Sequence, residues 1–374
     1  MKKTAFIYDV IYPYSIGGVE QRIYNLSINL KKNYEVHIIG MKYWNGAKNI
    51  KRNGIYYHGI MKKRDIYKRS GDRNIIEPII FSMKLFLFLL KNNFDIIDNQ
   101  SFPFFNIFSV YFAKRFSKTN IFTTWHEVWD IKYWIEYKGF IVGTIGFFIQ
   151  YLSLIFSLNI IANSNHTKKK IEDVINIKKI KGVIPNGINI KESSCYKIKK
   201  IYDLSFAGRL KDFKNVDKII NLIKNNKDMS AIIIGDGDQL EKLKKQSLGL
   251  NIKFTGFLDN QNEVYRYIMQ SKIFMMLSQR EGFSIATLES LSLGIPVICF
   301  NGKDNAATDL IENNINGIKT NLEEKNIKDA IYTIYNNYNF FSTNAMKVKN
   351  KYSYTKITKD LTDIYTTVKS SNFF

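Results

Sequence analysis

The chain has 374 residues, of which 45% are hydrophobic, and it carries a net charge of +22. This length exceeds one typical hydrophobic core and predicts two or three domains, while the apolar content excludes a disordered or fibrous protein. The two cysteines, Cys195 and Cys299, are far apart and show no metal-ligand spacing, so we expect free thiols in a reducing compartment.

The first elements of the chain predict a strand, a glycine-bearing turn and a helix. Residues 4–8 (TAFIY) form the expected strand, and residues 14–20 (YSIGGVE) form the expected turn. Gly17 and Gly18 let the backbone approach a ligand closely, but the pattern is not G-x-G-x-x-G, so a dinucleotide fingerprint is absent. Because Met1 and two lysines lead directly into the strand, we expect no signal peptide.

A histidine follows a second apolar strand. Residues 121–129 (IFTTWHEVW) place His126 just after the strand and between two tryptophans. A histidine in such a sequence is more often a member of a packed aromatic cluster. Its position at a strand end favours a site instead, and of the four histidines it is the one in an active-site context.

The second half of the chain opens with a basic turn. A strand is predicted at 201–206, followed by Gly208 and Arg209, with Lys214 at the start of a helix. The bidentate guanidinium of Arg209 and the compact ammonium charge of Lys214 can together bind a diphosphate at the strand end. The D-x-D pattern at 236–238 resembles a metal-binding motif, but it follows a strand as ordinary turn residues do, and we expect no metal there.

Two glutamates, Glu281 and Glu289, stand eight residues apart in a strand–turn–helix pattern. The apolar run 273–277 predicts a buried strand, and Glu281 lies in the turn that follows it. Ser284 is placed to cap a helix that ends at Gly294, before a further strand at 295–298. Ligands bind at such strand ends in open parallel sheets, where N–H groups favour anions and carboxylates accept hydrogen bonds from hydroxyls. An isolated E-x7-E is more often a solvated pair.

Four motifs that follow one another along the chain argue against the alternative that Glu281 and Glu289 are only a solvated pair. They are G-R-L-x-x-x-K-N at 208–215, I-G-D-G at 234–237, F-T-G-F-L at 254–258 and E-G-F-S-x-x-x-L-E at 281–289. Together they resemble the family 4 retaining glycosyltransferases of the GT-B fold, over roughly residues 1 to 370. The resemblance implies an α/β fold with two Rossmann-like domains whose parallel sheets face across a cleft.

The resemblance also implies domain boundaries. Residues 1–190 would form an amino-terminal acceptor-side domain, and residues 191–351 a carboxyl-terminal nucleotide-sugar-binding domain. Residues 352–374, which show helical spacing of apolar residues, would pack back on the first domain. A polar basic stretch, Lys191 to Lys200, would follow the boundary.

The resemblance implies a role for each motif. Arg209 and Lys214 would neutralise the diphosphate, and Glu289 would accept hydrogen bonds from the ribose. Glu281 would hold the sugar, and His126 would contact it near the reacting carbon. The turn 256–258 would line the base, and the Gly17-Gly18 loop would lie near the donor phosphate. The expected donor-binding residues are Gly17, Gly18, Gly208, Arg209, Lys214, Gly256, Phe257, Leu258, Glu281, Gly282, Phe283, Ser284 and Glu289, and the expected catalytic residues are His126, Glu281, Arg209 and Lys214.

The chain departs from the family pattern at one position, and it lacks the carboxylate pair of a glycosidase. Asn215 replaces the family's frequent glycine after the lysine, and we expect little cost because the backbone there need not be special. No carboxylate pair stands where a glycosidase-type nucleophile belongs, and front-face, donor-assisted transfer is the family's usual proposal. The nucleotide-sugar, such as a UDP- or GDP-sugar, is a co-substrate; we expect no cofactor and no metal.

The amino-terminal half is basic and contains long apolar segments. Residues 1–190 hold 28 Lys and Arg against 13 Asp and Glu, a net charge of +15. Residues 140–162 carry no charge over 23 positions, but they include Gln150 and a family-like strand at 158–162, which leaves a helix of about 17 residues. With a second apolar helix at 78–90, this pattern favours interfacial attachment to an anionic membrane over spanning. A solvated basic surface is the alternative.

The sequence therefore predicts a glycosyltransferase that moves a sugar from a nucleotide-sugar to a hydroxyl acceptor, a lipid-linked glycan or surface polysaccharide precursor. We expect it to be peripheral on the cytoplasmic face of the membrane, with no nucleic acid as partner. The alternatives are a nucleotide-sugar epimerase of GT-B architecture, which calls for further acid and base residues, and a non-catalytic membrane-associated nucleotide-sugar-binding protein.

Overall fold

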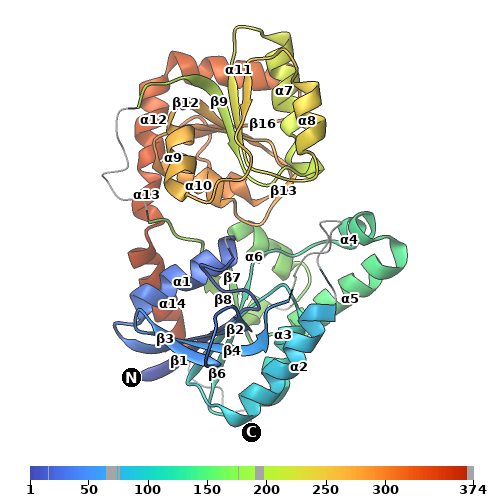
Figure 1. Ribbon diagram of the computed structural model, residues 1–374, viewed down its shortest axis with the longest axis vertical. Helices are drawn as coiled ribbons and strands as arrows, with labels where there is room; N and C mark the ends of the chain where they lie inside the picture. Colours follow the sequence, from blue (N-terminus) through green and yellow to red (C-terminus); the bar gives the residue numbers. More distant parts are fainter. Residues whose placement is uncertain (16, 65–73, 75, 176, 190–197, 369–374) are drawn as a thin grey trace. The chain divides into compact units, whose positions relative to one another are not determined.

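The computed structural model describes residues 1–374 except 16, 65–73, 75, 176, 190–197 and 369–374. The chain divides into two compact units, one formed by Met1–Gly187 with Tyr354–Phe374 and the other by Ile188–Ser353. Cys195 and most of the basic stretch 191–200 lie outside the described residues. Both units are α/β with parallel sheets, as the sequence predicts (Figure 1).

The first unit is built on an eight-stranded sheet within the described residues, with the strand order β3-β4-β2-β1-β5-β6-β7-β8. All neighbouring strands are parallel except β3 and β4, which form an antiparallel hairpin. The strands are β1 Lys2–Ile7, β2 Tyr34–Lys42, β3 Asn49–Arg52, β4 Ile55–Lys62, β5 Ile96–Gln100, β6 Asn120–Trp125, β7 Asn159–Ala162 and β8 Ile180–Val183.

Helices cover both faces of this sheet. The core on one face is made with α1 and α14, and the core on the other face is made with α2, α3, α4 and α5. Because α14 packs beside α1, the end of the described chain belongs to the first unit (Figure 1). The helices of this unit are α1 Gly18–Leu30, α2 Ile76–Lys91, α3 Phe105–Lys114, α4 Ile131–Lys138, α5 Phe140–Phe156, α6 Asn165–Glu172 and α14 Tyr354–Thr367.

The second unit has a six-stranded parallel sheet within the described residues, in the order β11-β10-β9-β12-β14-β16, and a separate two-stranded ladder β13-β15. The strands are β9 Tyr202–Ala207, β10 Ala231–Ile234, β11 Ile252–Phe254, β12 Ser271–Met276, β13 Arg280–Glu281, β14 Val297–Phe300, β15 Asp304–Asn305 and β16 Gly317–Thr320. The central strands are buried on both faces, which explains their continuous apolar runs.

Helices of the second unit also form two layers. One core joins the sheet to α9, α10 and α13, and the other joins it to α7, α8 and α11. The helices are α7 Val216–Asn225, α8 Leu240–Gln246, α9 Gln261–Met269, α10 Ile285–Ser292, α11 Glu324–Asn336, α12 Tyr338–Met346 and α13 Val348–Lys351.

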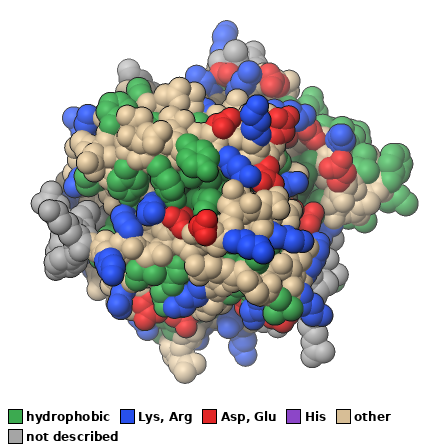
Figure 2. All heavy atoms as spheres, turned by 90° about the horizontal axis from the view of Figure 1, so that it is seen from above, with side chains coloured by type: hydrophobic (Ala, Val, Ile, Leu, Met, Phe, Trp, Pro, Cys, Tyr) green, Lys and Arg blue, Asp and Glu red, His purple; other side chains and the backbone are tan. Residues whose placement is uncertain are grey.

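The apolar segments of the first unit form the elements that their sequence predicts. Helix α5 covers Phe140–Phe156 and is followed by strand β7, and the segment at 78–90 lies within α2. No helix in the described part of the chain is long and apolar enough to cross a bilayer. Figure 2 shows Lys and Arg side chains spread over the face in view, interspersed with acidic and hydrophobic ones.

Candidate functional site

The second unit has a topological switch point at β9. Chain order runs from β9 outward to β10 and β11 on one side and then to β12, β14 and β16 on the other. Because all these strands are parallel, their carboxyl ends meet at one edge of the sheet. Ligands of open α/β sheets bind in the crevice beside such a point. The motifs at 208–215 and 281–289 follow β9 and β12, the two strands that flank it.

Backbone groups approach one another closely after β9 and β10. A Cβ built on Gly235 would lie 2.0 Å from the Gly208 carbonyl oxygen, and one on Gly237 would lie 2.2 Å from the Leu210 carbonyl oxygen. Gly208, Gly235 and Gly256 also have positive φ angles of 153°, 130° and 69°. Glycine is therefore required here for space and for conformation. Sequence reasoning used Gly235 and Gly237 only as a family signature and assigned them no function.

Lys214 and Glu281 meet across the switch point. The Lys214 Nζ donates to Glu281 Oε1 at 2.5 Å, and the two side chains are 15% and 12% exposed. Lys214 ends a short 3-10 turn, Asp212–Lys214, and Glu281 lies in the short strand β13. The turn is tied to the segment after β12 by a hydrogen bond from the Gln279 N–H to the Phe213 carbonyl, which is 2.8 Å long. The fold thus brings a cation and a carboxylate that are 67 residues apart in sequence into direct contact.

One expectation about the segment that holds Glu281 needs correction. Glu281 does not lie in a simple turn, because Arg280 and Glu281 pair with Asp304 and Asn305 as the ladder β13-β15. This pairing fixes the backbone of Glu281, and the bend follows it. The ladder also brings Arg280 to the site, with its guanidinium 5.0 Å from the centre of the Phe213 ring. No motif marked Arg280 as part of the site.

The expectation that the backbone at Asn215 need not be special is wrong. Asn215 has φ 53° and ψ 38°, which is the left-handed conformation that favours glycine. Asparagine is the side chain that tolerates this conformation best. Here it also donates from Nδ2 to the Leu277 carbonyl at 2.8 Å, which joins the loop after β9 to the end of β12. Asparagine therefore keeps the turn and adds a hydrogen bond that glycine lacks.

Ser284 begins α10 as the sequence predicts. Its side chain accepts a hydrogen bond from the Thr287 N–H, α10 ends at Ser292, and Gly294 follows in the left-handed conformation. Ser284 itself has φ 68°, and Phe283 beside it is buried in the core that includes α10. The start of α10 is thus anchored on both sides, with Gly282 in the bend between β13 and the helix.

Glu289 lies within α10 and is 8% exposed. Its Oε1 accepts hydrogen bonds from Gln261 Nε2 at 2.9 Å and from the Tyr265 hydroxyl at 3.1 Å, both on α9. Burial raises the pKa of Glu289 to about 7, and the two hydrogen bonds only partly oppose this rise. The structure does not bring Glu289 into contact with Lys214 or Glu281. It holds the carboxyl in a separate, poorly solvated position.

Of the remaining expected donor-binding residues of this unit, three are exposed and two are half-buried. Gly208 and Arg209 lie at the surface after β9, and Phe257 is 60% exposed in the loop after β11. Gly256 is bonded to the neighbouring loop, because its carbonyl accepts from the Gly235 N–H at 3.0 Å. Leu258 packs against the core that contains α10. An exposed aromatic ring and an exposed guanidinium therefore stand on the same strand-end edge, on loops that follow β11 and β9, with β10 between these two strands.

The D-x-D segment is engaged in the turn after β10. The Asp236 carboxylate accepts a hydrogen bond from the Gly237 N–H at 2.6 Å, and Asp238 forms an ion pair with Lys211 at 2.7 Å. Among the described residues, no group of three His, Cys, Asp or Glu side chains is placed to hold a metal ion.

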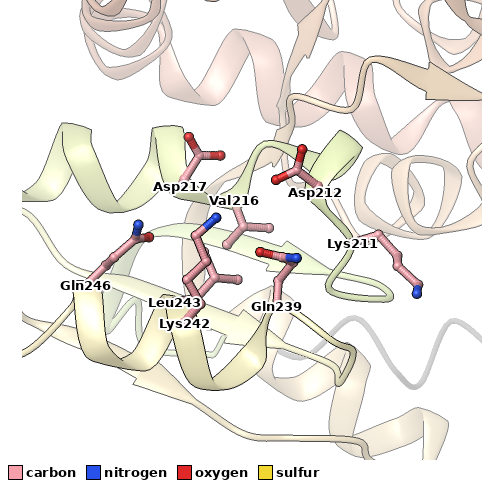
Figure 3. Close-up of a pocket in the computed structure, with 8 residues that line it drawn as sticks. All are labelled: Lys211, Asp212, Val216, Asp217, Gln239, Lys242, Leu243 and Gln246. Carbon is pink, nitrogen blue, oxygen red and sulfur yellow. The ribbon is translucent and has the colours of Figure 1, made fainter. Parts of the chain in front are cut away.

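A small pocket of about 90 Å³ lies between the start of α7 and helix α8. Figure 3 shows Asp212, Asp217 and Lys242 among the side chains around it. None of the expected site residues lines this pocket. It is therefore separate from the strand-end site.

In the first unit, His126 follows β6 and is held by a buried polar network. Its ring Nε2 lies 3.0 Å from Gln100 Oε1, and the amide nitrogen of Gln100 donates to Asp98 Oδ1 at 2.8 Å. This order of bonds places the ring proton on Nε2 and leaves Nδ1 as an acceptor. Burial and the charge of Arg22 lower the pKa of His126 to about 3, so the ring is neutral at physiological pH.

Asp98 anchors this network. It accepts hydrogen bonds from Thr124 Oγ1 at 2.7 Å and from the Tyr365 hydroxyl on α14 at 2.6 Å. Burial raises the pKa of Asp98, and these hydrogen bonds together with the charge of Arg22 oppose the rise. The carboxyl-terminal helix thus supports the residues that hold His126, a connection that no local motif indicates.

The Gly17-Gly18 turn opens helix α1. Gly17 is the residue before the helix, and a Cβ built on it would lie 2.7 Å from the carboxylate of Glu20. Glu20 is buried, and its Oε1 accepts a hydrogen bond from the Ser15 hydroxyl at 2.8 Å. The absent side chain at Gly17 therefore makes room for a carboxylate of the first helical turn.

The two α/β units and the strand-end site define the class of protein. Solved structures with the same architecture are glycosyltransferases, so the fold is GT-B. They include sucrose-phosphate synthase from Thermosynechococcus elongatus, with a TM-score of 0.80 at 13% identity over 98% of this chain and 99% of that one. The HepE protein of Anabaena, in complex with UDP and glucose, has a TM-score of 0.74 at 16% identity over 98% of this chain and 100% of that one.

Family models match most of the chain. The model described as Glycosyltransferase Family 4 matches residues 16–192, and the one described as Glycosyl transferases group 1 matches residues 195–353. The chain belongs to the family 4 glycosyltransferases. It is 28% identical over 210 residues to the O-antigen biosynthesis glycosyltransferase WbnH of Escherichia coli, a match that spans 54% of this chain and 58% of that protein.

Proposed function

We propose that the protein is a retaining glycosyltransferase that transfers a sugar from a nucleoside diphosphate sugar to a hydroxyl of a lipid-linked glycan. The observation that carries this proposal is the ion pair of Lys214 and Glu281 at the switch point of the second unit. A ligand bound there meets a cation for its phosphates and a carboxylate for its sugar hydroxyls. The relation to an O-antigen biosynthesis glycosyltransferase and the UDP-bound state of the Anabaena neighbour support this reading.

Arg209 and Lys214 act on the leaving group. In the reaction, the bond between the anomeric carbon and the diphosphate oxygen breaks, and a bond from the anomeric carbon to the acceptor oxygen forms on the same face. Negative charge grows on the departing diphosphate, which receives the proton of the acceptor hydroxyl. Cationic side chains placed at that oxygen stabilise the transition state more than the ground state. In this proposal, these cations and backbone N–H groups neutralise the diphosphate in place of a metal ion.

Glu281 and Glu289 divide the donor between them. Glu281, held against Lys214, accepts hydrogen bonds from the transferred sugar, with the Gly282-Phe283 backbone beside it. Glu289 accepts hydrogen bonds from the ribose, oriented by Gln261 and Tyr265. The exposed Phe257 packs on the base. The closely packed glycine loops let the diphosphate reach backbone N–H groups.

His126 contributes as a neutral acceptor. Since Gln100 binds Nε2, the free Nδ1 lone pair is available to a hydroxyl of the transferred sugar near the reacting carbon. Its depressed pKa excludes a role as a proton donor near neutral pH. We therefore assign His126 to positioning the sugar, and Gly17 with Gly18 to the loop beside it.

The first unit is proposed to bind the cytoplasmic face of an anionic membrane. Helix α3 packs against α2 and α5, and the three helices expose large apolar side chains, with the basic residues Lys84 on α2 and Arg115 directly after α3 also exposed. Leu87 is 59% exposed and Phe148 57% exposed, positions where burial in lipid removes apolar area from water. The +15 charge of residues 1–190 adds attraction to anionic lipid.

A panel of nucleoside diphosphate sugars tests the reaction. The purified protein is incubated with UDP- and GDP-sugars, with and without lipid-linked acceptors from bacterial membranes, and nucleoside diphosphate release is measured. We expect release with one donor, stimulated by acceptor and lost in Lys214→Ala. Conversion of the donor to an isomer would indicate an epimerase, and binding without release would indicate a non-catalytic binding protein.

Vesicle co-sedimentation tests the membrane proposal separately. Binding should be strong with anionic vesicles, weak with zwitterionic vesicles, and reduced by salt. Phe148→Glu should weaken binding, whereas Leu248→Glu, at an exposed apolar residue of the second unit, should not. Absence of binding to anionic vesicles at low salt would remove the membrane from the proposal.

A further inference from the structure

The first unit contains a cavity whose lining includes neither His126 nor the residues of its network. It has a volume of about 280 Å³, close to the lower end of the range of about 300–1,000 Å³ for small-molecule pockets. Its walls come from the loop before α1, from α1 itself, from the segment after β2 and from the β3–β4 hairpin. The aromatic and basic side chains that line it are Tyr12, Tyr14, Tyr24, Trp44, Tyr57 and Arg52.

The aromatic rings of this cavity form two supported groups. Tyr14 is stacked on Tyr43 with ring centres 5.5 Å apart, and its other neighbour Trp44 is held by a hydrogen bond from Nε1 to the Ala47 carbonyl at 2.8 Å. On α1, Tyr24 contacts Tyr12 at 4.8 Å between ring centres. Rings fixed in this way offer flat apolar faces without the entropic cost of ordering them on binding.

Polar groups stand at the edge of the same cavity. The Arg52 guanidinium donates to the Tyr14 hydroxyl, and Asn53 Nδ2 donates to the Tyr24 hydroxyl at 3.4 Å. Arg52 and Asn53 are both exposed at the tip of the β3–β4 hairpin, so their remaining donors face solvent at the cavity mouth. Trp44 and Tyr57 are buried as part of the hydrophobic core, whereas Tyr14 remains 37% exposed on the open side of the cavity.

Flat aromatic faces with hydrogen-bond donors and acceptors at the rim suit a carbohydrate. One face of a pyranose ring presents C–H groups, which pack on aromatic rings, while the hydroxyls around its edge require donors and acceptors. A lipid chain would leave the rim groups without partners, and a free phosphate would find one arginine and no enclosing N–H groups. Among the described residues that line the cavity, Arg52 is the one cation, whereas a diphosphate would call for two.

We propose that this cavity binds a sugar unit of the acceptor glycan. The inference rests on the proposed function and deepens it, because it gives the acceptor a glycan portion that the protein recognises directly. Tyr12 and Tyr14 belong to the same connection, between β1 and α1, that carries Gly17 and Gly18. Specificity for the acceptor then resides in the loop before α1 and in the β3–β4 hairpin, apart from the donor-binding motifs of the second unit.

The first test measures kinetics with donor and acceptor varied separately. Tyr14→Ala and Arg52→Ala should each raise the KM for the acceptor at least tenfold and change the KM for the donor less than threefold. Lys51→Ala is the matched control, since Lys51 neighbours Arg52 on β3 and donates to Tyr56 instead of a cavity residue. An acceptor KM within twofold of wild type in both cavity variants would overturn the proposal.

The second test does not depend on catalysis. Wild type, Tyr14→Ala, Arg52→Ala and Lys51→Ala are applied to an array of bacterial surface oligosaccharides, after circular dichroism has confirmed that each is folded. Binding by wild type and Lys51→Ala that is reduced at least tenfold in both cavity variants supports the site even if no donor is turned over. Equal binding by all four proteins, or binding by none, contradicts it. Failure of the donor panel alone would instead count against the proposed reaction.

Discussion

Replacing Glu289 by glutamine is predicted to stabilise the protein in a pH-dependent manner. Burial raises the pKa of Glu289 from its ordinary value of 4.5 to about 7. A carboxyl whose pKa is higher in the folded state binds its proton more tightly there than in the unfolded chain. Its contribution to stability is therefore complete below pH 4.5 and is lost as the pH rises through about 7. Above that pH, the folded protein holds a buried carboxylate that lacks full solvation.

The two pKa values give the size of the effect. Between about pH 5.5 and pH 8, the wild-type protein should lose about 2 kcal/mol of unfolding free energy from this group, at ~1.36 kcal/mol per pKa unit. Glu289→Gln keeps an oxygen that can accept from Gln261 and Tyr265 but has no proton to lose. The stability gained by the substitution should therefore be about 2 kcal/mol larger at the higher pH, equivalent to about 4–8 °C in melting temperature for a unit of this size.

Calorimetry at both pH values is the appropriate assay. All four tryptophans lie at positions 44, 125, 129 and 134 of the first unit, so their fluorescence reports only that unit, whereas heat capacity reports both. Glu263→Gln serves as the control, because Glu263 is an exposed carboxylate on the first turn of α9 and its loss should change stability by less than about 0.5 kcal/mol. A difference between Glu289→Gln and wild type that is the same at both pH values would refute the reasoning.

Three further predictions concern the same unit. Arg209→Ala should weaken nucleoside diphosphate binding by about 1.5–3 kcal/mol in isothermal titration calorimetry without loss of folding; unchanged affinity there and in Lys214→Ala would reject the diphosphate clamp. Glu281→Gln should reduce transfer more than nucleoside diphosphate affinity, whereas Glu289→Ala should reduce that affinity; equal losses would reject the division between sugar and ribose. Asn215→Ala should cost about 2–3 kcal/mol in urea unfolding, from left-handed strain and the unpaired Leu277 carbonyl, and Asn215→Gly about half of that; equal costs would show that the left-handed backbone is unimportant.

The sequence alone determined the α/β class and the approximate places where the strands around the candidate site end. These features depend on local patterns, namely continuous apolar runs for buried strands, Ser284 as a cap and Gly294 as a terminator. Because parallel strands all end at one edge of a sheet, locating the strand ends also located the candidate site. The two apolar helices of the first unit followed from composition in the same way.

Only the tertiary structure decided how the site residues interact. The ion pair of Lys214 and Glu281 and the bond from Tyr365 to Asp98 join residues 67 and 267 positions apart, and no local pattern encodes such pairings. The left-handed backbone of Asn215 and the hydrogen bond from its side chain to the end of β12 are also seen only in the folded chain. The raised pKa of Glu289 and the aromatic cavity beside α1 likewise arise from burial among several elements, because solvation and shape are properties of the packed chain.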